Sequence, residues 1–168
     1  MSQNTSTTGT NGDAQLTVSG QGIAQKADDV RILVADKPYI WGGKTTDGFD
    51  CSGYVSYVFR QLFPNSGGLY QLSAAGFASS TLFNDVTDIA ERRAGDIIYF
   101  PPHNNSPAHV GIFYDGATWI GSQSAGVRKV PFNNPWWGAR PKKIRRLAAI
   151  SVLSMNAGRG VASPTMLA

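Results

Sequence analysis

The sequence predicts an α+β fold, in which N-terminal helices pack on a mostly antiparallel sheet. The first half of the 168-residue chain carries apolar residues at helical spacing. The second half consists of short apolar or alternating runs separated by Pro, Asn and Gly. An Asp115-Gly116 pair between two of these runs is typical of a hairpin. Helices followed by such strands are the pattern of an α+β domain.

We divide the chain into three parts. Residues 1–19 are rich in Ser, Thr, Gly, Asn and Gln, and this composition holds too little apolar surface to offset the entropy of ordering. We therefore expect a flexible arm there. Residues 20–147 are long enough to bury one core, and they form the single predicted domain. Residues 148–168 show no clear period, and we interpret them as a C-terminal extension.

Three helices are expected. The first, over 23–34, has apolar residues at helical spacing and ends before Pro38. The second, over 51–63, has Asp47 or Asp50 available as its N-cap and Pro64 as its stop. A short third helix is expected over 73–81. The predicted strands cover 96–100, 109–114, 118–122, 127–131 and 144–147.

Cys51 is the only cysteine of the chain, so it forms no internal disulfide. It stands at the start of the second predicted helix, where unpaired amides favour a thiolate and offer a donor to an oxyanion. His109 opens a predicted strand, from which its ring projects toward that helix. A thiol and an imidazole so arranged are typical of acyl transfer. The competing interpretations are a buried structural cysteine and a core histidine.

Four segments carry a more specific signal because they occur in order along the chain. They are Pro38-Tyr39-Ile40-Trp41-Gly42-Gly43, Asp50-Cys51-Ser52-Gly53-Tyr54-Val55, Ala94-Gly95-Asp96-Ile97-Ile98-Tyr99-Phe100 and His109-Val110-Gly111-Ile112-Phe113. In this order they resemble the blocks of the NlpC family of cell-wall cysteine peptidases. Trp137-Gly138-Ala139-Arg140 is similar to the closing strand of that family, here interrupted by Pro141.

This resemblance implies a papain-like, NlpC-type domain that cleaves an amide in the stem peptide of peptidoglycan, most often between D-glutamate and the following diamino acid. It implies Cys51 as nucleophile and His109 as base, with no cofactor and no metal. Tyr39 would lie near the thiol, where it helps to bind substrate or the oxyanion. Asp50 and Ser52 match positions that recognise a free amine, although Asp50 also suits a helix cap. We expect Trp41 to line the groove.

The third catalytic position departs from the family. Many members carry a histidine in a strand where this chain reads Ile120-Gly121-Ser122-Gln123-Ser124. A side-chain amide oxygen can orient an imidazole by accepting its N–H. Strand alternation places Gly121 and Gln123 on the same face, so Gln123 is the candidate. Ser122 and a backbone carbonyl remain alternatives.

Composition and charge limit which partners, metals and membrane segments the chain could have. The formal net charge is +4, and most of it comes from Arg128, Lys129 and a cluster over 140–146. Such a cluster attracts anionic wall polymers, or it is only a solvated strand end. No nucleic-acid-binding signature is present, so no nucleic-acid partner is expected. Two histidines and one cysteine do not form a zinc site. No run of about 20 apolar residues predicts a membrane span, and no secretory signal is recognisable.

The leading function is therefore a peptidoglycan amidase or endopeptidase. Two alternatives stand beside it. One is a thiol acyltransferase or deacylase acting on lipid or small amides, which a wide apolar cleft would favour. The other is a non-catalytic wall-binding module, which a Cys51 buried away from His109 would support. We expect a monomer made in the cytoplasm and delivered without a signal peptide to a bacterial wall or periplasm. An injected antibacterial effector, blocked by an immunity protein, fits that expectation.

Overall fold

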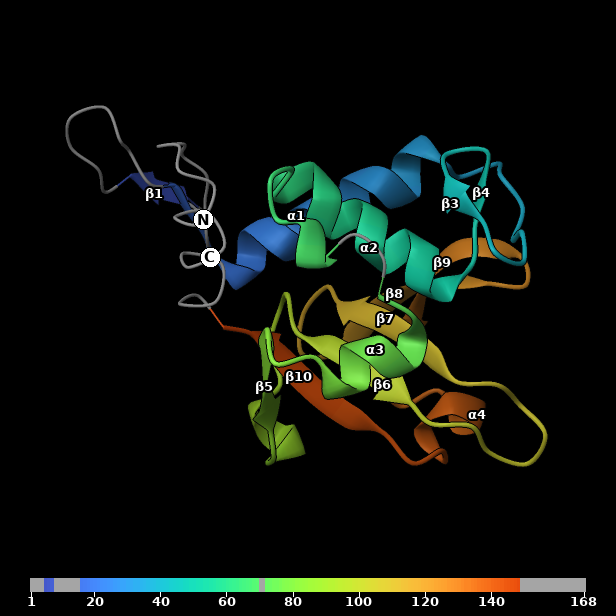
Figure 1. The fold of residues 1–168 in the computed structure, drawn as a ribbon. Helices are drawn as coiled ribbons and strands as arrows, with labels where there is room; N and C mark the ends of the chain where they lie inside the picture. Colours follow the sequence, from blue (N-terminus) through green and yellow to red (C-terminus); the bar gives the residue numbers. More distant parts are fainter. Residues whose placement is uncertain (1–4, 8–15, 70–71, 149–168) are drawn as a thin grey trace.

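The computed structural model describes residues 5–7, 16–69 and 72–148. Within these residues the predicted α+β class is confirmed, because helices precede a six-stranded antiparallel sheet. Figure 1 shows α1 (Gly20–Leu33) and α2 (Cys51–Leu62) lying together over one side of the sheet. The predicted C-terminal extension lies outside the described residues from residue 149 onward.

Two short strands belong to the segment expected as a flexible arm. β1 (Thr5–Thr7) and β2 (Leu16–Val18) pair as an antiparallel ribbon that the sequence analysis did not foresee. The other residues of the predicted arm before Val18 lie outside the described part of the chain. Ser19 then caps α1, since its Oγ accepts a hydrogen bond from the amide of Gly22 at 3.1 Å.

Helix α2 lies at the centre of the molecule. Asp50 is its N-cap, and the carboxylate Oδ1 accepts from the amide of Gly53 at 2.6 Å. The helix ends before Pro64, as predicted. Tyr54 is fully buried and donates its hydroxyl to the carbonyl of Ala27 in α1 at 2.6 Å. This bond links the two helices across an otherwise apolar interface.

The large sheet has the strand order β5-β10-β6-β7-β8-β9, and every neighbouring pair is antiparallel. All five predicted strands are present in it. The turn at Asp115-Gly116 joins β7 to β8, and Asp115 accepts from the amide of Ala117 at 2.8 Å. The strands are β5 (Phe83–Val86), β6 (Ile97–Phe100), β7 (His109–Phe113), β8 (Thr118–Gln123), β9 (Gly126–Pro131) and β10 (Lys143–Leu147).

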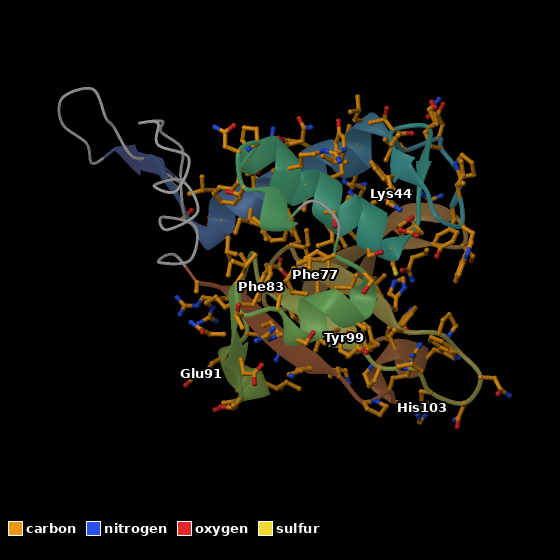
Figure 2. The ribbon with its side chains drawn as sticks, in the orientation of Figure 1. Lys44, Phe77, Phe83, Glu91, Tyr99 and His103 are labelled. Carbon is orange, nitrogen blue, oxygen red and sulfur yellow. The ribbon has the colours of Figure 1, made fainter. Side chains whose placement is uncertain are left out.

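Several short elements were not predicted. The edge strand β5 has only Phe83 fully buried, so its sequence lacks a strong apolar alternation. A two-stranded ribbon of β3 (Lys44–Thr45) and β4 (Gly48–Phe49) precedes α2. The third helix is present but shorter than predicted, as α3 (Ala74–Ser79). Figure 2 labels Phe77 of α3 and Phe83, whose rings meet edge to face with centroids 5.7 Å apart.

The expectation that Trp137-Gly138-Ala139-Arg140 forms the closing strand is wrong. Trp137 and Gly138 belong to a short helix, α4 (Pro135–Gly138). Asn134 caps it by accepting from the amides of Trp136 and Trp137, and proline is suited to the first helical position. Pro141 has no amide to give to a sheet ladder, so β10 begins only at Lys143.

Apolar side chains fill both faces of the sheet. The larger cluster lies between the sheet and the helices α1, α2 and α3, and it includes Val58, Phe59 and Val110. A smaller cluster on the other face contains Phe100 and Trp119, and Trp137 packs against it. The first residues of α2 and of β7 meet α4 where these two clusters adjoin. The candidate site lies at this junction.

Candidate active site

Cys51 is the first residue of α2, and its side chain is 7% exposed. The sulfur faces backbone amides: the N–H groups of Val110, Ser52 and Cys51 favour its anionic form. Burial acts more strongly in the opposite direction and raises the pKa of the Cys51 thiol to about 11. The helix start therefore does not make a resting thiolate, and the thiol of the free protein is protonated at neutral pH.

A tight turn, Trp41-Gly42-Gly43, is attached to the start of α2. The Asp50 carboxylate accepts from the Gly42 amide at 3.2 Å while it caps the helix through Gly53. Gly42 has a φ of +78°, a conformation that favours glycine. A Cβ on Gly53 would lie 2.0 Å from the carbonyl oxygen of Gly43. Close backbone approach explains why glycines surround the cysteine on both sides.

His109 is the first residue of β7 and is 9% exposed. Its Nε2 lies 2.7 Å from Oε1 of Gln123 in β8. An amide oxygen only accepts, so this bond assigns the proton to Nε2 and leaves the lone pair on Nδ1. Burial, reinforced by the positive charge of Arg140, lowers the pKa of His109 to about 4, although Gln123 acts to raise it. The imidazole is therefore a neutral base at pH 7.

Aromatic rings enclose the imidazole of His109. Trp137 lies over it with ring centroids 4.6 Å apart and an interplanar angle of 32°. Trp119 approaches edge to face at 5.8 Å, and Phe100 lies at 6.3 Å. Together with Gln123 these rings fix the orientation of the imidazole. The sequence analysis placed Trp137 in a closing strand, and its contact with His109 was not foreseen.

Gly121 and Ser122, which precede Gln123 in β8, explain how Gln123 takes the place of the histidine found in many family members. Ser122 points away from His109, and its hydroxyl donates to the carbonyl of Phe49 at 2.7 Å in a buried bond. A Cβ on Gly121 would lie 3.3 Å from both Gln123 Oε1 and His109 Nε2. The glycine thus leaves space that the Gln123 amide occupies. Of the two side chains weighed from sequence, only Gln123 contacts the imidazole.

Tyr39 lies close to Cys51, and both residues line the same cavity. The backbone amide of Cys51 faces the Tyr39 oxygen as a hydrogen-bond donor. Burial, together with the charges of Cys51 and Asp50, raises the pKa of Tyr39 to about 12, so the phenol keeps its proton at neutral pH. The Tyr39 hydroxyl and the Cys51 amide therefore lie close to each other.

One cavity of about 460 Å³ brings these residues together. Cys51 and His109 both line it, and so do all four residues proposed for substrate binding, Tyr39, Trp41, Asp50 and Ser52. Trp41 is 80% exposed at its edge. Aromatic and small apolar side chains form much of the remaining wall, and they include Ala74, Ala75, Pro107, Ala108, Trp136 and Trp137. Gln123 lies behind His109 and does not line the cavity.

The chain resembles known proteins in sequence. A profile of the NlpC/P60 family matches residues 36–146. "Probable peptidoglycan endopeptidase LytE" of Bacillus subtilis is 34% identical over 118 residues, which cover 70% of this chain and 32% of LytE. The "Murein DD-endopeptidase MepS/Murein LD-carboxypeptidase" of Escherichia coli K12 is 30% identical over 131 residues, covering 73% of this chain and 66% of that protein. The chain belongs to the NlpC/P60 family.

Solved structures agree with this assignment. The NlpC/p60 domain of the peptidoglycan hydrolase SagA superposes with a TM-score of 0.55 at 25% identity, over 76% of this chain and 98% of that domain. NlpC2 from Trichomonas vaginalis, at 21% identity and a TM-score of 0.56, shares the fold. The predicted NlpC-type α+β domain of a hydrolase family is confirmed. This chain spans about a third of the length of LytE and about a quarter of p60 from Listeria grayi.

The basic cluster of this NlpC/P60 domain is not one surface. Arg145 is 7% exposed and binds Asp85 at 2.9 Å, and Arg146 binds Asp96 at 2.8 Å. Lys129 lies 3.8 Å from Asp28. Ion pairs within the fold use several of these charges, so neither a surface for anionic wall polymers nor a fully solvated strand end describes the whole cluster. Arg128, Arg140 and Lys142 form no ion pair among the described residues, and of these three Arg140 lines the cavity of Cys51.

In the ranges that the structure describes, no three His, Cys, Asp or Glu side chains gather as a metal site would require. No helix within those ranges is both long enough and apolar enough to cross a membrane.

Proposed function

We propose that this NlpC/P60 domain hydrolyses an amide bond in the stem peptide of peptidoglycan, between D-glutamate and the following diamino acid, through a Cys51 acyl-enzyme. The names of the relatives LytE and MepS support the substrate class. One observation carries the mechanism: the bond from His109 Nε2 to Gln123 leaves Nδ1 unprotonated, and His109 and Cys51 line the same cavity.

The resting pair is a neutral thiol and a neutral imidazole. In the proposed reaction, Sγ of Cys51 attacks the amide carbon while Nδ1 of His109 accepts the thiol proton. The tetrahedral intermediate collapses when the imidazolium returns that proton to the leaving nitrogen, which breaks the C–N bond. Water then attacks the thioester, giving its proton to Nδ1, and the thiol regains a proton as the acid leaves. Gln123 holds the ring through both steps.

Two donors are in place for the developing negative charge. The Cys51 amide and the Tyr39 hydroxyl lie close to each other, and we propose that they bind the oxyanion. We assign Asp50 and Ser52 to a substrate amine, and Trp41 to contact with the peptide at the rim. The Asp50 carboxylate already accepts from Gly42, Gly53 and Ser52, so it is held rigidly for that role.

The test uses the intact chain and its Cys51→Ala variant, with sacculi and with soluble stem peptides. Mass spectrometry of the fragments identifies the bond. We expect new termini from the wild type at the D-glutamyl bond and none from Cys51→Ala, with equal thermal unfolding of the two proteins. Cleavage at another stem-peptide bond would contradict the proposed D-glutamyl specificity but not the hydrolase function. Intact substrate from a reduced wild-type protein would contradict the hydrolase assignment.

A second function has one observation in its favour. The cavity wall is largely apolar and aromatic, as a thiol acyltransferase or deacylase acting on lipid or small amides would need. The same acyl-enzyme serves either function, because only the second nucleophile differs. Incubation with acylated lipid and amine acceptors, beside the stem peptides, separates the two. A non-catalytic wall-binding role is not supported, since Cys51 and His109 line one cavity.

Peptidoglycan as substrate requires that the protein act outside the cytoplasmic membrane of a bacterium. We propose delivery to the periplasm or wall, with an antibacterial effector role and an immunity protein that occupies the cleft. Expression of wild type and Cys51→Ala directed to the periplasm of a test bacterium examines this. Lysis by the wild type alone is expected, and equal growth of both strains would exclude the effector role.

A further inference from the structure

Three cavities adjoin along one side of the domain. The central one contains Cys51 and His109. A second cavity, of about 240 Å³, shares Asp50, Ser52 and Ser73 with it. A third, of about 340 Å³, shares Ser106, Trp136 and Arg140 with it. The outer two share no lining residue, so the three lie in series.

The ends of this series are well separated. Lys44 lines the second cavity and His103 lines the third, and Figure 2 shows these two residues far apart, at the β3–β4 ribbon and at the loop between β6 and β7. Along this path the Asp50 carboxylate lies at one boundary of the central cavity and the Arg140 guanidinium at the other. A ligand in the central cavity therefore lies between opposite charges.

Arg140 is an unusual cation because it is 5% exposed and has no carboxylate partner among residues 18–69 and 72–148. Arg145, the other buried arginine, has Asp85 at 2.9 Å. Buried charges in proteins are normally paired, because desolvation disfavours them. The missing partner of Arg140 therefore calls for an explanation.

The surroundings of Arg140 hold the guanidinium in place without neutralising it. Its Nη2 donates to the carbonyls of Pro101 and Pro107, at 2.8 and 3.3 Å. The rings of Trp136 and Trp137 lie 5.2 and 5.1 Å from the guanidinium carbon and stabilise its charge. Nε is buried without a hydrogen-bond partner. Nη1 makes no hydrogen bond within the described residues either, and it is not sealed from solvent as Nε is.

We propose that Arg140 binds a carboxylate of the substrate beside the scissile amide, an assignment that rests on the proposed function. The Nη1 group has N–H donors available for a carboxylate oxygen, and the low-polarity aromatic wall strengthens the pairing. Stem peptides offer two such groups. One is the α-carboxylate of γ-linked D-glutamate on the acyl side, and the other is the second carboxylate of diaminopimelate on the leaving side.

Four soluble stem peptides distinguish the two sources. They carry D-glutamate or D-isoglutamine at the second position, and diaminopimelate or L-lysine at the third. Arg140→Gln removes the charge, and Arg140→Lys keeps it without the guanidinium geometry. Lys143→Gln is the matched control for loss of one positive charge, since its side chain is about half exposed and lies away from the cleft. For each variant kcat/KM is measured on all four peptides.

For Arg140→Gln we expect about a 10- to 100-fold loss of kcat/KM, the range of one charge-assisted hydrogen bond, on peptides that carry the recognised carboxylate. The loss should be absent when that carboxylate is replaced, and smaller for Arg140→Lys. If the loss of kcat/KM disappears when the second or the third residue of the peptide is replaced, the carboxylate that Arg140 binds belongs to that residue. Equal losses on all four peptides in both variants, or no loss, would overturn the assignment and leave Arg140 as a support for the 101–107 loop.

A binding measurement separates this proposal from the proposed function. Calorimetry with Cys51→Ala compares the affinity for the same four peptides with and without Arg140→Gln. Carboxylate-selective weakening supports the Arg140 site even if the wild type cleaves none of the peptides, a result that would contradict only the hydrolase function. Cleavage by the wild type with unselective binding would contradict only the Arg140 site.

Discussion

Oε1 of Gln123 lies 2.7 Å from Nε2 of His109, although Gln123 belongs to β8 and His109 begins β7. This bond sets the tautomer of the only buried histidine among the described residues. It leaves Nδ1 without a proton, as the proposed role of His109 as proton acceptor requires. The ring of Trp137, tilted by 32° with its centroid 4.6 Å away, packs against the same imidazole.

Replacing Gln123 should slow the reaction without unfolding the domain. We expect Gln123→Ala to lower kcat by roughly 10- to 100-fold. Without the amide oxygen the imidazole populates both tautomers and its ring rotates more freely, so Nδ1 is less often aligned with the thiol. Steady-state kinetics on a soluble stem peptide measures the effect. Gln123→Asn is the control that keeps the amide at shorter reach. A kcat unchanged in Gln123→Ala would show that a different group orients the ring.

Ser122 should behave differently from its neighbour. Its hydroxyl bonds the buried carbonyl of Phe49, so Ser122→Ala leaves that oxygen without its donor. We expect the free energy of unfolding to fall by about 1–3 kcal/mol, with kcat close to that of the wild type. Urea denaturation and kinetics on the same samples test this. A large fall in kcat at unchanged stability would assign Ser122 to the catalytic group instead.

The pH profile should reflect the lowered pKa of His109. Burial lowers this pKa to about 4, and a protonated imidazole cannot accept the thiol proton. We therefore expect kcat/KM of the wild type to be lost as the pH falls through about 4, not through the usual 6.5. Gln123→Glu places a carboxylate beside Nε2, which favours the imidazolium and should move the acid limb to higher pH. An unmoved limb in Gln123→Glu would show that a different group titrates.

Trp137 should act on His109 through position and desolvation. Trp137→Leu removes the stacked ring and admits water, so the pKa of His109 should rise toward its ordinary value. The expected result is a lower kcat, by about 10-fold, with an acid limb at higher pH. Trp136→Leu is the matched control, because Trp136 is 56% exposed and has no ring contact with His109 among the described contacts. Identical pH profiles for both variants would contradict this role for Trp137.

Local sequence was sufficient for most of the fold. Helix α2 is determined by Asp50 as a cap, Pro64 as a stop and apolar spacing between them, and the hairpin of β7 and β8 by Asp115-Gly116. These signals lie within a few residues of the structure that they specify. The strand β5 was missed because its partner β10 is remote in sequence. Helix α4 has a local signal in Asn134 and Pro135, and it was missed because the segment that follows was interpreted as a closing strand.

The sequence by itself also determined the family, the thiol and imidazole candidates, and Gln123 as the residue most suited to orient the ring. Only the tertiary structure decided which charges are used within the fold and which are not. Arg140 and Arg145 are five residues apart in one basic run, yet one lines the cleft and the other is paired with Asp85. The tertiary structure also decided the resting protonation states of Cys51 and His109. Their pKa values depend on burial, and burial depends on the side chains that other segments of the chain place around them.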